Sequence, residues 1–399
     1  MAVADALLSI DEAIALVLSH VTMLEPEDVQ LAEADGRVLA ETARSAVDLP
    51  PFPSSAMDGF ALRAADTPGT LPIVERIATG RPSSRPLEAG EAMAIGTGGV
   101  VPGGADAVVP IELVDERGDV VAVPGNVVQG DNVRRRGGDL QSGDAVVESG
   151  VRLGAARIGA LAAAGVMSVR CTRRPRVAVI VTGSELRSPG EPLEPGQIYD
   201  SNGFILAAQL RSTGAEVERL PAVADDRAAT KAAIERGLAA DVLVTTGGVS
   251  VGTYDLVRAA EAELGVEEIF WRVAMQPGKP VAFGVRGRTL VFGLPGNPVS
   301  SLVGFELFVR PALLALQGLA DPWPAFRPGR LRSPAKRLSA RDALLRARIR
   351  VEGDELLLDP LTGQQSHMIA HAAAADALVL IPQGEGELAA GTPVSYLSL

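Results

Sequence analysis

Three glycine-rich segments with hydroxyl side chains carry the clearest chemical signal in this 399-residue sequence. They contain Thr182-Gly183-Ser184-Glu185, Thr246-Gly247-Gly248-Val249-Ser250 and Gly293-Leu294-Pro295-Gly296-Asn297. Glycine lets the backbone approach a ligand closely, and free N–H groups at a helix start bind anions. Any one segment could be only a tight strand-to-helix turn. Three in one region, two of them rich in hydroxyl groups, favour a phosphate or oxyanion site. None has the spacing of a P-loop or of a dinucleotide fingerprint, which disfavours an ATPase or a dehydrogenase.

Carboxylates accompany these segments. Glu185, Asp226 and Asp255 each lie just after an expected strand or at an expected helix start. Hard oxygen ligands beside phosphates indicate Mg²⁺, which needs few protein carboxylates because water and phosphate complete its octahedron. Asp226 and Asp255 could instead be helix N-caps, whereas Glu185 has no such alternative.

Lys279 lies in the turn Gln276-Pro277-Gly278-Lys279-Pro280 and is one of only three lysines among 37 basic residues. A compact ammonium suits a tetrahedral oxyanion or a phosphate as a point charge. The alternative is a solvated surface turn.

Other motifs leave their alternatives open. Asp58 lies in a segment stiffened by prolines, which could be only the point where the chain enters a domain. The basic run Arg134–Asp139 is either a solvated surface or a patch that attracts an anionic substrate. His367 and His371 are four residues apart but have no third ligand in view, so we expect no metal there. Cys171 is expected to be a small buried hydrophobe.

The composition narrows the classes of protein. The formal net charge is −12, so the chain as a whole does not attract nucleic acid or an anionic membrane. One cysteine excludes a disulfide framework. No signal peptide and no run of 18 apolar residues is visible, so we expect a soluble, cytoplasmic protein.

The apolar pattern divides the chain into regions. Ser9 and Glu12 form a capping box for a first helix, and the stretch to about residue 45 is expected to be partly helical. Short β-like runs follow from 46 to 145, and helical character returns over 155–164. We expect strands again over 343–351, 355–358 and 377–381.

The region 173–320 alternates strands and helices, which predicts parallel pairing with helices on both faces of a sheet. The strands are expected over 176–182, 241–246 and 289–294. The helices are expected over 203–212, 227–239, 255–263 and 299–316, with Asn202 and either Asp225 or Asp226 as caps.

The motifs together resemble those of the MoeA-type molybdopterin molybdenumtransferases, a family related to the gephyrin and Cnx E domains. Six segments occur in the family's order across the chain: Pro53–Ala61, Arg136–Asp139, Thr182–Leu186, Thr246–Gly252, Gln276–Pro280 and Gly293–Ser300.

The resemblance implies an α/β multidomain fold. Its parts would be a discontinuous helical domain (1–45 and 146–172), an inserted β domain (46–145), a MogA-like doubly wound α/β domain (173–320) and a C-terminal β barrel (321–399). It also implies a homodimer whose active cleft lies between the α/β domain of one subunit and the β domain of the other.

The implied reaction inserts molybdenum from molybdate into adenylylated molybdopterin, with Mg²⁺-dependent loss of AMP, to give molybdenum cofactor. By the resemblance, Asp58, Thr97, Glu185, Asp226 and Asp255 would be catalytic, with Asp58 acting from the partner subunit, and the last three would hold Mg²⁺. The expected substrate-binding residues are Thr182, Gly183, Ser184, Gly247, Gly248, Ser250, Arg272, Gly296 and Asn297, and the expected molybdate-binding residues are Lys279, Ser300, Arg346 and Ser366.

The chain departs from the family at two positions: Gln276 stands where relatives often carry lysine, and Arg272 stands where some members do. Two alternatives are a MogA-type adenylyltransferase, which shares the α/β unit, and a non-catalytic scaffold like the gephyrin E domain. Besides its substrates, the resemblance implies the MogA-type adenylyltransferase as a partner, and neither nucleic acid nor membrane.

Overall fold

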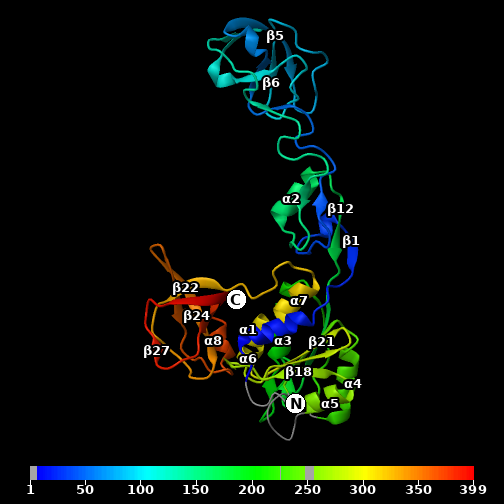
Figure 1. Cartoon of the computed structure of the whole chain (residues 1–399), viewed down its shortest axis with the longest axis vertical. Coiled ribbons are helices and arrows are strands. Elements are labelled where there is room, and N and C mark those ends of the chain that lie inside the picture. Colours follow the sequence, from blue (N-terminus) through cyan, green and yellow to red (C-terminus); the bar gives the residue numbers. More distant parts are fainter. Residues whose placement is uncertain (1–6, 225, 248–255) are drawn as a thin grey trace. The chain divides into compact units, whose positions relative to one another are not determined.

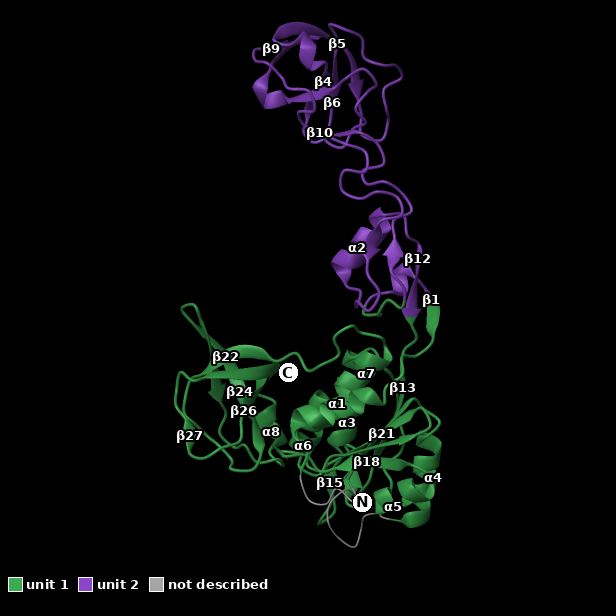
Figure 2. Ribbon diagram, in the orientation of Figure 1, with its two compact units in different colours: residues 1–27, 36–40, 172–399 green, residues 28–35, 41–171 purple. Residues whose placement is uncertain are grey.

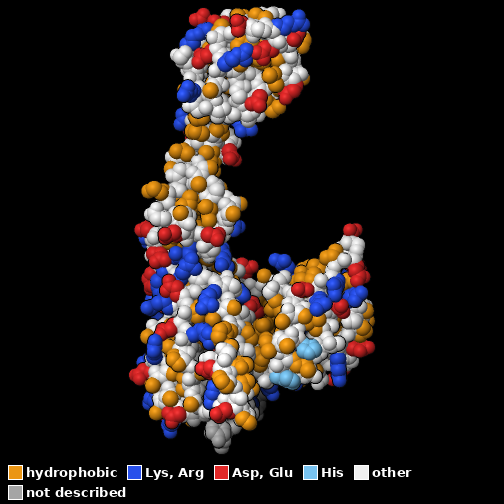
Figure 3. Space-filling model, turned by 180° about the vertical axis from the view of Figure 1, so that it is seen from behind, with side chains coloured by type: hydrophobic (Ala, Val, Ile, Leu, Met, Phe, Trp, Pro, Cys, Tyr) orange, Lys and Arg blue, Asp and Glu red, His pale blue; other side chains and the backbone are white. Residues whose placement is uncertain are grey.

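The computed structural model describes residues 7–224, 226–247 and 256–399, which form two compact units. Unit 1 comprises residues 1–27, 36–40 and 172–399, and unit 2 comprises residues 28–35 and 41–171 (Figures 1 and 2). On the face shown in Figure 3, acidic and basic side chains are interspersed over both units.

A six-stranded sheet forms the centre of unit 1, in the order β16-β13-β17-β21-β20-β18. The first four strands are parallel, whereas β20 is antiparallel to both of its neighbours. The carboxyl end of β18 therefore lies at the same edge as those of β13, β17 and β21. The strands are β13 (Arg176–Val181), β16 (Glu216–Arg219), β17 (Val242–Thr246), β18 (Glu267–Trp271), β20 (Ala282–Arg286) and β21 (Thr289–Leu294).

Successive side chains of the central strands point to opposite faces of this sheet, and each face packs on helices. Val242 and Val244 belong to one buried cluster with Leu206 of α3, whereas Leu243 belongs to another with Ile234 of α4. The helices on the two faces are α3 (Asn202–Ser212) and α6 (Pro298–Gly304) on one, and α4 (Arg227–Gly237) and α5 (Leu256–Glu263) on the other. The expected α/β arrangement is confirmed for these elements.

The sequence analysis missed β16, β18 and β20. The strand β16 reads Glu-Val-Glu-Arg and is mostly exposed, so it lacks the apolar run that predicts a buried strand. The stretch from α1 to about residue 45, expected to be partly helical, has only one short helical turn: it forms β1 (Pro26–Gln30), a 3₁₀ turn (Leu31–Glu33) and β2 (Ala43–Arg44).

The first helix, α1 (Ile10–Ser19), begins with the expected capping box. The Glu12 amide donates to Ser9 Oγ at 3.2 Å, and the Ser9 amide donates to Glu12 Oε2 at 2.8 Å. Ile14 and Val17 then pack into the main core.

The helical segment expected over 299–316 is interrupted. A π-helical turn, Phe305–Val309, separates α6 from α7 (Arg310–Leu316). Pro311 has no N–H to donate to Leu307, four residues earlier, which explains the break in the regular ladder. Among the described residues this helical segment, Pro298–Leu316, is the one long and apolar enough to cross a membrane, but 78% of it is buried. It is a core helix.

The C-terminal part of unit 1 is a five-stranded barrel. β24 pairs with β25 and also with β26, which closes the ring β24-β25-β22-β28-β26. The short β19 (Met275–Gln276) pairs with β24 and ties the Lys279 turn to the barrel. The barrel strands are β22 (Arg327–Leu331), β24 (Asp342–Glu352), β25 (Glu355–Pro360), β26 (Ala377–Ile381) and β28 (Pro393–Ser398).

Unit 2 contains the expected β-rich region, a six-stranded sheet in the order β7-β4-β6-β5-β9-β8 around Phe60, Leu62 and Val121. Its strands are β4 (Gly59–Leu62), β5 (Gly69–Ile77), β6 (Ala92–Ile95), β7 (Ala107–Pro110), β8 (Asp115–Arg117) and β9 (Val120–Val123). The other α-helices and β-strands among the described residues are β3 (Ser54–Ser55), β10 (Val133–Arg134), β11 (Ala145–Val147), α2 (Ala155–Ala163), β12 (Ser168–Thr172), β14 (Leu186–Arg187), β15 (Ile198–Tyr199), β23 (Ala335–Lys336), α8 (Ile369–Ala372) and β27 (Glu387–Leu388).

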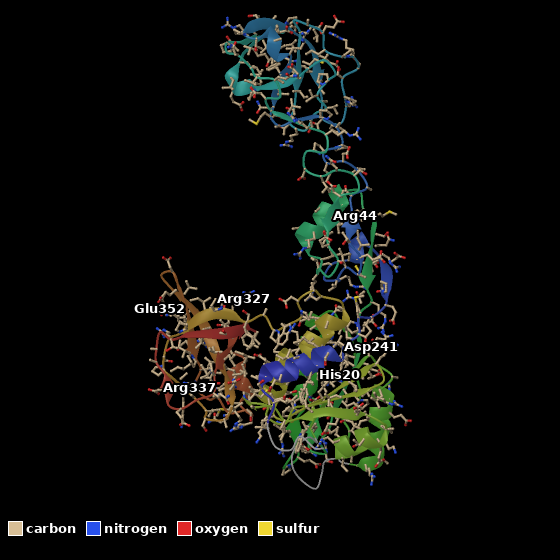
Figure 4. The ribbon with its side chains drawn as sticks, in the orientation of Figure 1. His20, Arg44, Asp241, Arg327, Arg337 and Glu352 are labelled. Carbon is tan, nitrogen blue, oxygen red and sulfur yellow. The ribbon has the colours of Figure 1, made fainter. Side chains whose placement is uncertain are left out.

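Asp241, labelled in Figure 4, anchors the start of β17. Its two carboxylate oxygens accept hydrogen bonds from the Arg173 guanidinium, both at 2.7 Å, and Oδ2 also accepts from the Arg176 amide at 2.8 Å. Burial by itself would raise the pKa of Asp241, but the hydrogen bonds from Arg173 and Arg176 outweigh it and lower the pKa below its usual value.

We predict that Asp241→Asn destabilises unit 1 by about 2–4 kcal/mol at neutral pH, because it leaves the Arg173 guanidinium without its charged partner. Since the folded-state pKa is lowered, this contribution is present above the unfolded-state value of about 3.9 and is lost as pH falls through the folded-state pKa. Urea unfolding followed by tryptophan fluorescence measures the effect, because both tryptophans, Trp271 and Trp323, belong to unit 1.

Glu355→Gln is the matched control, since it removes only an exposed ion pair with Arg330 at 3.6 Å. Its unfolding midpoint should equal that of the wild type. A wild-type midpoint for Asp241→Asn at neutral pH would contradict the assignment.

Candidate functional site

The three glycine-rich segments meet at the carboxyl edge of the central sheet. The Thr182 amide donates to the Thr246 carbonyl at 3.0 Å, and the Gly247 amide donates to the Leu294 carbonyl at 3.3 Å. Gly247 has φ 93°, and a Cβ there would lie 2.6 Å from the Thr182 carbonyl oxygen. Only glycine fits this close approach, so the loops that follow β13 and β17 can meet here because residue 247 is a glycine.

Asn202 holds two of these loops together. Its Nδ2 donates to Thr246 Oγ1 at 3.0 Å and to the Gly296 carbonyl at 2.7 Å, and the side chain is buried. The expectation that Asn202 caps α3 is therefore wrong. The N-cap of α3 is Ser201, whose side chain makes no capping bond, and Asp200 Oδ1 accepts from the Gly203 amide in the first turn at 2.8 Å instead.

Glu185 lies beyond the end of β13 and is exposed. A Cβ on Gly183 would lie within 2.8 Å of both carboxylate oxygens of Glu185, so glycine makes room for this acid. Within the described ranges, the Glu185 carboxylate has no hydrogen-bond or ion-pair partner. It is therefore available to an external ligand.

Asp226 is the N-cap of α4, as expected, and its Oδ1 accepts from the Ala229 amide at 2.7 Å. Three predicted residues, Gly248, Ser250 and Asp255, lie outside the described residues. In the part of the chain that is described, no three His, Cys, Asp or Glu side chains lie close enough to share a metal ion. The described residues thus offer at most a partial set of metal ligands.

A cavity of about 460 Å³ lies where the Lys279 turn and the start of α6 meet the barrel. Three of the four predicted oxyanion-binding residues, Lys279, Ser300 and Ser366, line it, as does Asn297. The full lining is Met275, Gln276, Pro277, Gly278, Lys279, Pro280, Asn297, Ser300, Arg341, Gln364, Gln365, Ser366 and His367. None of these is an Asp or a Glu, so the charge that the described residues bring to this cavity is positive.

Arg346, the fourth predicted residue, does not line the cavity. It is 1% exposed, and its guanidinium donates to the Gly363, Gln365 and Met368 carbonyls at 2.6, 3.2 and 2.8 Å. Burial lowers the pKa of Arg346. Its donors are directed to backbone carbonyls, so it positions the segment 363–368, which carries Ser366.

Arg341 is a cavity residue that the sequence analysis missed. It precedes β24 and lines the cavity beside Lys279. Within the described parts of the chain, neither cation has a hydrogen-bond or ion-pair partner. The one local sign of Arg341 in the sequence was that a basic residue lies five positions before Arg346. Basic residues are too common for that spacing to single it out.

Arg272 lies just beyond β18, at the same edge of the sheet as the glycine-rich loops. Its guanidinium stacks on the Trp271 ring at 3.6 Å, and Arg258 stacks on the same ring at 4.2 Å. Arg272 has φ 80°, an uncommon backbone conformation for a residue with a side chain. Aromatic stacking therefore restrains this guanidinium at the edge of the sheet that carries the glycine-rich loops.

Asp58 and Thr97 lie together in unit 2, as expected. Asp58 Oδ1 accepts from the Thr97 amide at 2.6 Å and from Thr97 Oγ1 at 2.8 Å. These bonds, the backbone one first, lower the pKa of Asp58. The pair presents an ionised, exposed carboxylate.

A doubly wound α/β sheet with glycine-rich loops at its carboxyl edge defines the structural class. Three family models match the chain: the MoeA N-terminal region (domain I and II) over residues 8–165, the probable molybdopterin binding domain over 178–315, and the MoeA C-terminal region (domain IV) over 328–399. The chain belongs to the MoeA family of molybdopterin molybdenumtransferases.

Individual relatives cover the whole length. The chain is 39% identical over 413 residues to molybdopterin molybdenumtransferase 2 of Mycobacterium tuberculosis, covering 98% of this chain and 99% of the relative. A crystal structure of the molybdopterin biosynthesis MoeA protein from Pyrococcus horikoshii is 33% identical, with a TM-score of 0.82 and coverage of 98% and 99%. A second structure of a P. horikoshii MoeA protein is 27% identical, with a TM-score of 0.85 and coverage of 99% and 100%. The expected fold class is confirmed.

Proposed function

We propose that this chain transfers molybdenum from molybdate into adenylylated molybdopterin and releases AMP, which yields molybdenum cofactor. Membership of the MoeA family supports the reaction. The observation that carries the proposal is the cavity beside the anion-binding loops, in which Lys279 and Arg341 are unpaired within the described chain and no carboxylate lines the wall.

Molybdate is a tetrahedral dianion, and this cavity suits it. Lys279 and Arg341 supply charge, and the hydroxyl groups of Ser300 and Ser366 supply neutral hydrogen bonds to the oxyanion. Gln276 can only hydrogen-bond, so Arg341 provides the second positive charge. Arg346 acts indirectly, by holding the segment that carries Ser366.

The loops at the sheet edge bind the phosphates of the nucleotide-bearing substrate in this proposal. The residues are Thr182, Gly183, Ser184, Gly247, Gly248, Ser250, Gly296 and Asn297, with Arg272 as the restrained cation. The thiolates that accept molybdenum belong to the substrate, so no protein thiol is required. Cys171, which is fully buried, is not needed for the chemistry.

A divalent cation, Mg²⁺, completes the proposed site. Glu185, whose carboxylate is free among the described residues, suits a hard cation, and Asp226 offers the oxygen that does not cap α4. Asp255 is the third proposed ligand. The ion would offset the charge of the phosphoanhydride as AMP leaves.

Asp58 and Thr97 are proposed to act from a second copy of the chain, so the working form is a homodimer. We further propose a cytoplasmic location, receipt of substrate from a MogA-type adenylyltransferase, and the four-part division into 1–45 with 146–172, 46–145, 173–320 and 321–399.

Release of AMP tests the function directly. Purified protein with adenylylated molybdopterin, molybdate and Mg²⁺ should release AMP and form a product that activates an apo-molybdoenzyme. Without molybdate the release should be slower. Attachment of AMP to molybdopterin from ATP would instead show an adenylyltransferase, and no nucleotide chemistry at all would favour a scaffold.

We predict that Lys279→Ala raises the molybdate concentration needed for half-maximal AMP release by roughly tenfold, because it removes a charge-assisted contact. Affinity for the adenylylated substrate should change less than about twofold. Lys336→Ala, at an exposed lysine outside the cavity, is the matched control and should behave as wild type. Equal losses for both ligands in Lys279→Ala would remove Lys279 from the oxyanion site.

We predict that Glu185→Gln and Asp226→Asn each raise the Mg²⁺ concentration required for AMP release by about tenfold, since each removes a charged oxygen ligand. Asn is as good an N-cap as Asp, so Asp226→Asn keeps α4 capped and its thermal stability should not change. A Mg²⁺ requirement like that of wild type in Asp226→Asn would restrict this residue to capping.

A further inference from the structure

His367 lines the same cavity as Lys279 and Arg341, although it took no part in the proposed function. It is exposed, and its ring forms no hydrogen bond to any described residue. The other two histidines lie elsewhere: His20 Nδ1 is 2.8 Å from the Leu16 carbonyl oxygen, and His371 does not line the cavity. α8 begins at Ile369, so His367 and His371 do not share a helix face as a metal-binding pair would.

The backbone that carries His367 is held from both sides. The Val299 amide at the start of α6 donates to the Ser366 carbonyl at 3.1 Å, and the Ile369 amide donates to the His367 carbonyl at 2.9 Å. The buried Arg346 guanidinium donates to the Gln365 and Met368 carbonyls, one before His367 in the chain and one after it. The imidazole is therefore presented to the cavity from a restrained segment rather than from a free loop.

The charged and titratable groups around this ring are cationic. Lys279 faces the cavity from the 276–280 turn, Arg341 faces it from the start of β24, Arg346 lies below the segment, and His371 follows on α8. No Asp or Glu of the described chain lines the cavity. A bound oxyanion is thus the negative charge that this ring would meet there.

We propose that His367 makes oxyanion binding in this cavity depend on pH. An imidazole changes charge between about pH 5 and pH 8. Its protonated form adds a third positive charge beside Lys279 and Arg341, so affinity for molybdate rises as pH falls through the titration of the ring. By linkage, binding of a dianion and protonation of the ring favour each other. This inference rests on the proposed assignment of the cavity to molybdate.

Calorimetric titration of the full chain with sodium molybdate at constant ionic strength tests the proposal. The wild type should bind molybdate about fivefold more tightly at about pH 6 than at about pH 8.5. His367→Asn should bind with the same affinity at both pH values, near that of the wild type at the higher pH. Because the variant is titrated with the same salt, it also measures any contribution from protonation of molybdate itself.

His371→Asn is the matched control, since it removes a second exposed histidine outside the cavity and should keep the wild-type pH dependence. Proton NMR adds a direct measurement, because the chain has only three histidines. The signal missing from His367→Asn identifies the ring, and its titration midpoint should rise on saturation with molybdate.

The outcomes separate the two proposals. Binding with the same affinity at both pH values in the wild type, or an unchanged pH dependence in His367→Asn, would overturn the role of His367 and leave the cavity as the oxyanion site. An absence of molybdate binding at either pH would overturn both.

Discussion

The site depends on keeping positive charge unpaired in a protein that carries 49 acidic and 37 basic residues. Many arginines of unit 1 are neutralised by carboxylates, as Arg173 is by Asp241 and Arg310 by Glu306. Lys279 and Arg341 escape this pairing because, among the residues that the structure describes, no carboxylate lines their cavity. Two like charges so placed repel each other, and an oxyanion relieves that repulsion. The electrostatics of the cavity therefore favour binding of an anion over the empty state.

Because Lys279 and Arg341 are unpaired in the described chain, the walls of the cavity must also hold them in place before an anion binds. A flexible wall would let Lys279 and Arg341 turn away toward solvent, where their charge is better hydrated. The structure opposes this with a turn bounded by Pro277 and Pro280 on one side and with the segment held by Arg346 on the other. A buried guanidinium is costly unless its donors are satisfied, and three backbone carbonyls satisfy it here. In the proposed site, Arg346 holds the shape of the cavity without contacting the anion. The groups that do contact the anion are then fixed in advance and need not reorganise during the reaction.

The sequence was sufficient for the elements that are long, apolar and locally signalled. β13, β17 and β21 are continuous hydrophobic runs, and each ends in a glycine-rich turn, so both the strands and the meeting point of their loops could be predicted. β16 and β18 could not, because each carries at least two charged residues and lacks the continuous apolar run of a buried strand. Asn202 was misassigned because a polar residue at a helix start suggests a cap, whereas the N-cap is Ser201 and the side chain that accepts from the first turn is that of Asp200.

Arg341 and His367 were missed as cavity residues for a different reason. They lie more than 60 residues beyond Lys279 in the chain, and long-range contacts such as the pairing of β19 with β24 and the bond from the Val299 amide to the Ser366 carbonyl bring the barrel to the 276–280 turn. Such a long-range contact leaves no local pattern in the sequence. Arg346 shows that residue type alone can mislead. An arginine suggested a contact with an anion, whereas its burial and its hydrogen bonds indicate that it positions other residues.

The division of labour within unit 1 follows from this geometry. The region matched by the probable molybdopterin binding domain, 178–315, carries the loops at the sheet edge together with Lys279 and Ser300. Arg341, Ser366 and His367 belong to the C-terminal region, 328–399. The α/β domain alone would present the glycine-rich loops and one of the two cavity cations, a half-site open to solvent. Addition of the barrel closes that half-site into a cavity with a second fixed charge. In the proposed reaction, the barrel therefore turns a domain that can hold a pterin phosphate into one that can also hold a second anion beside it.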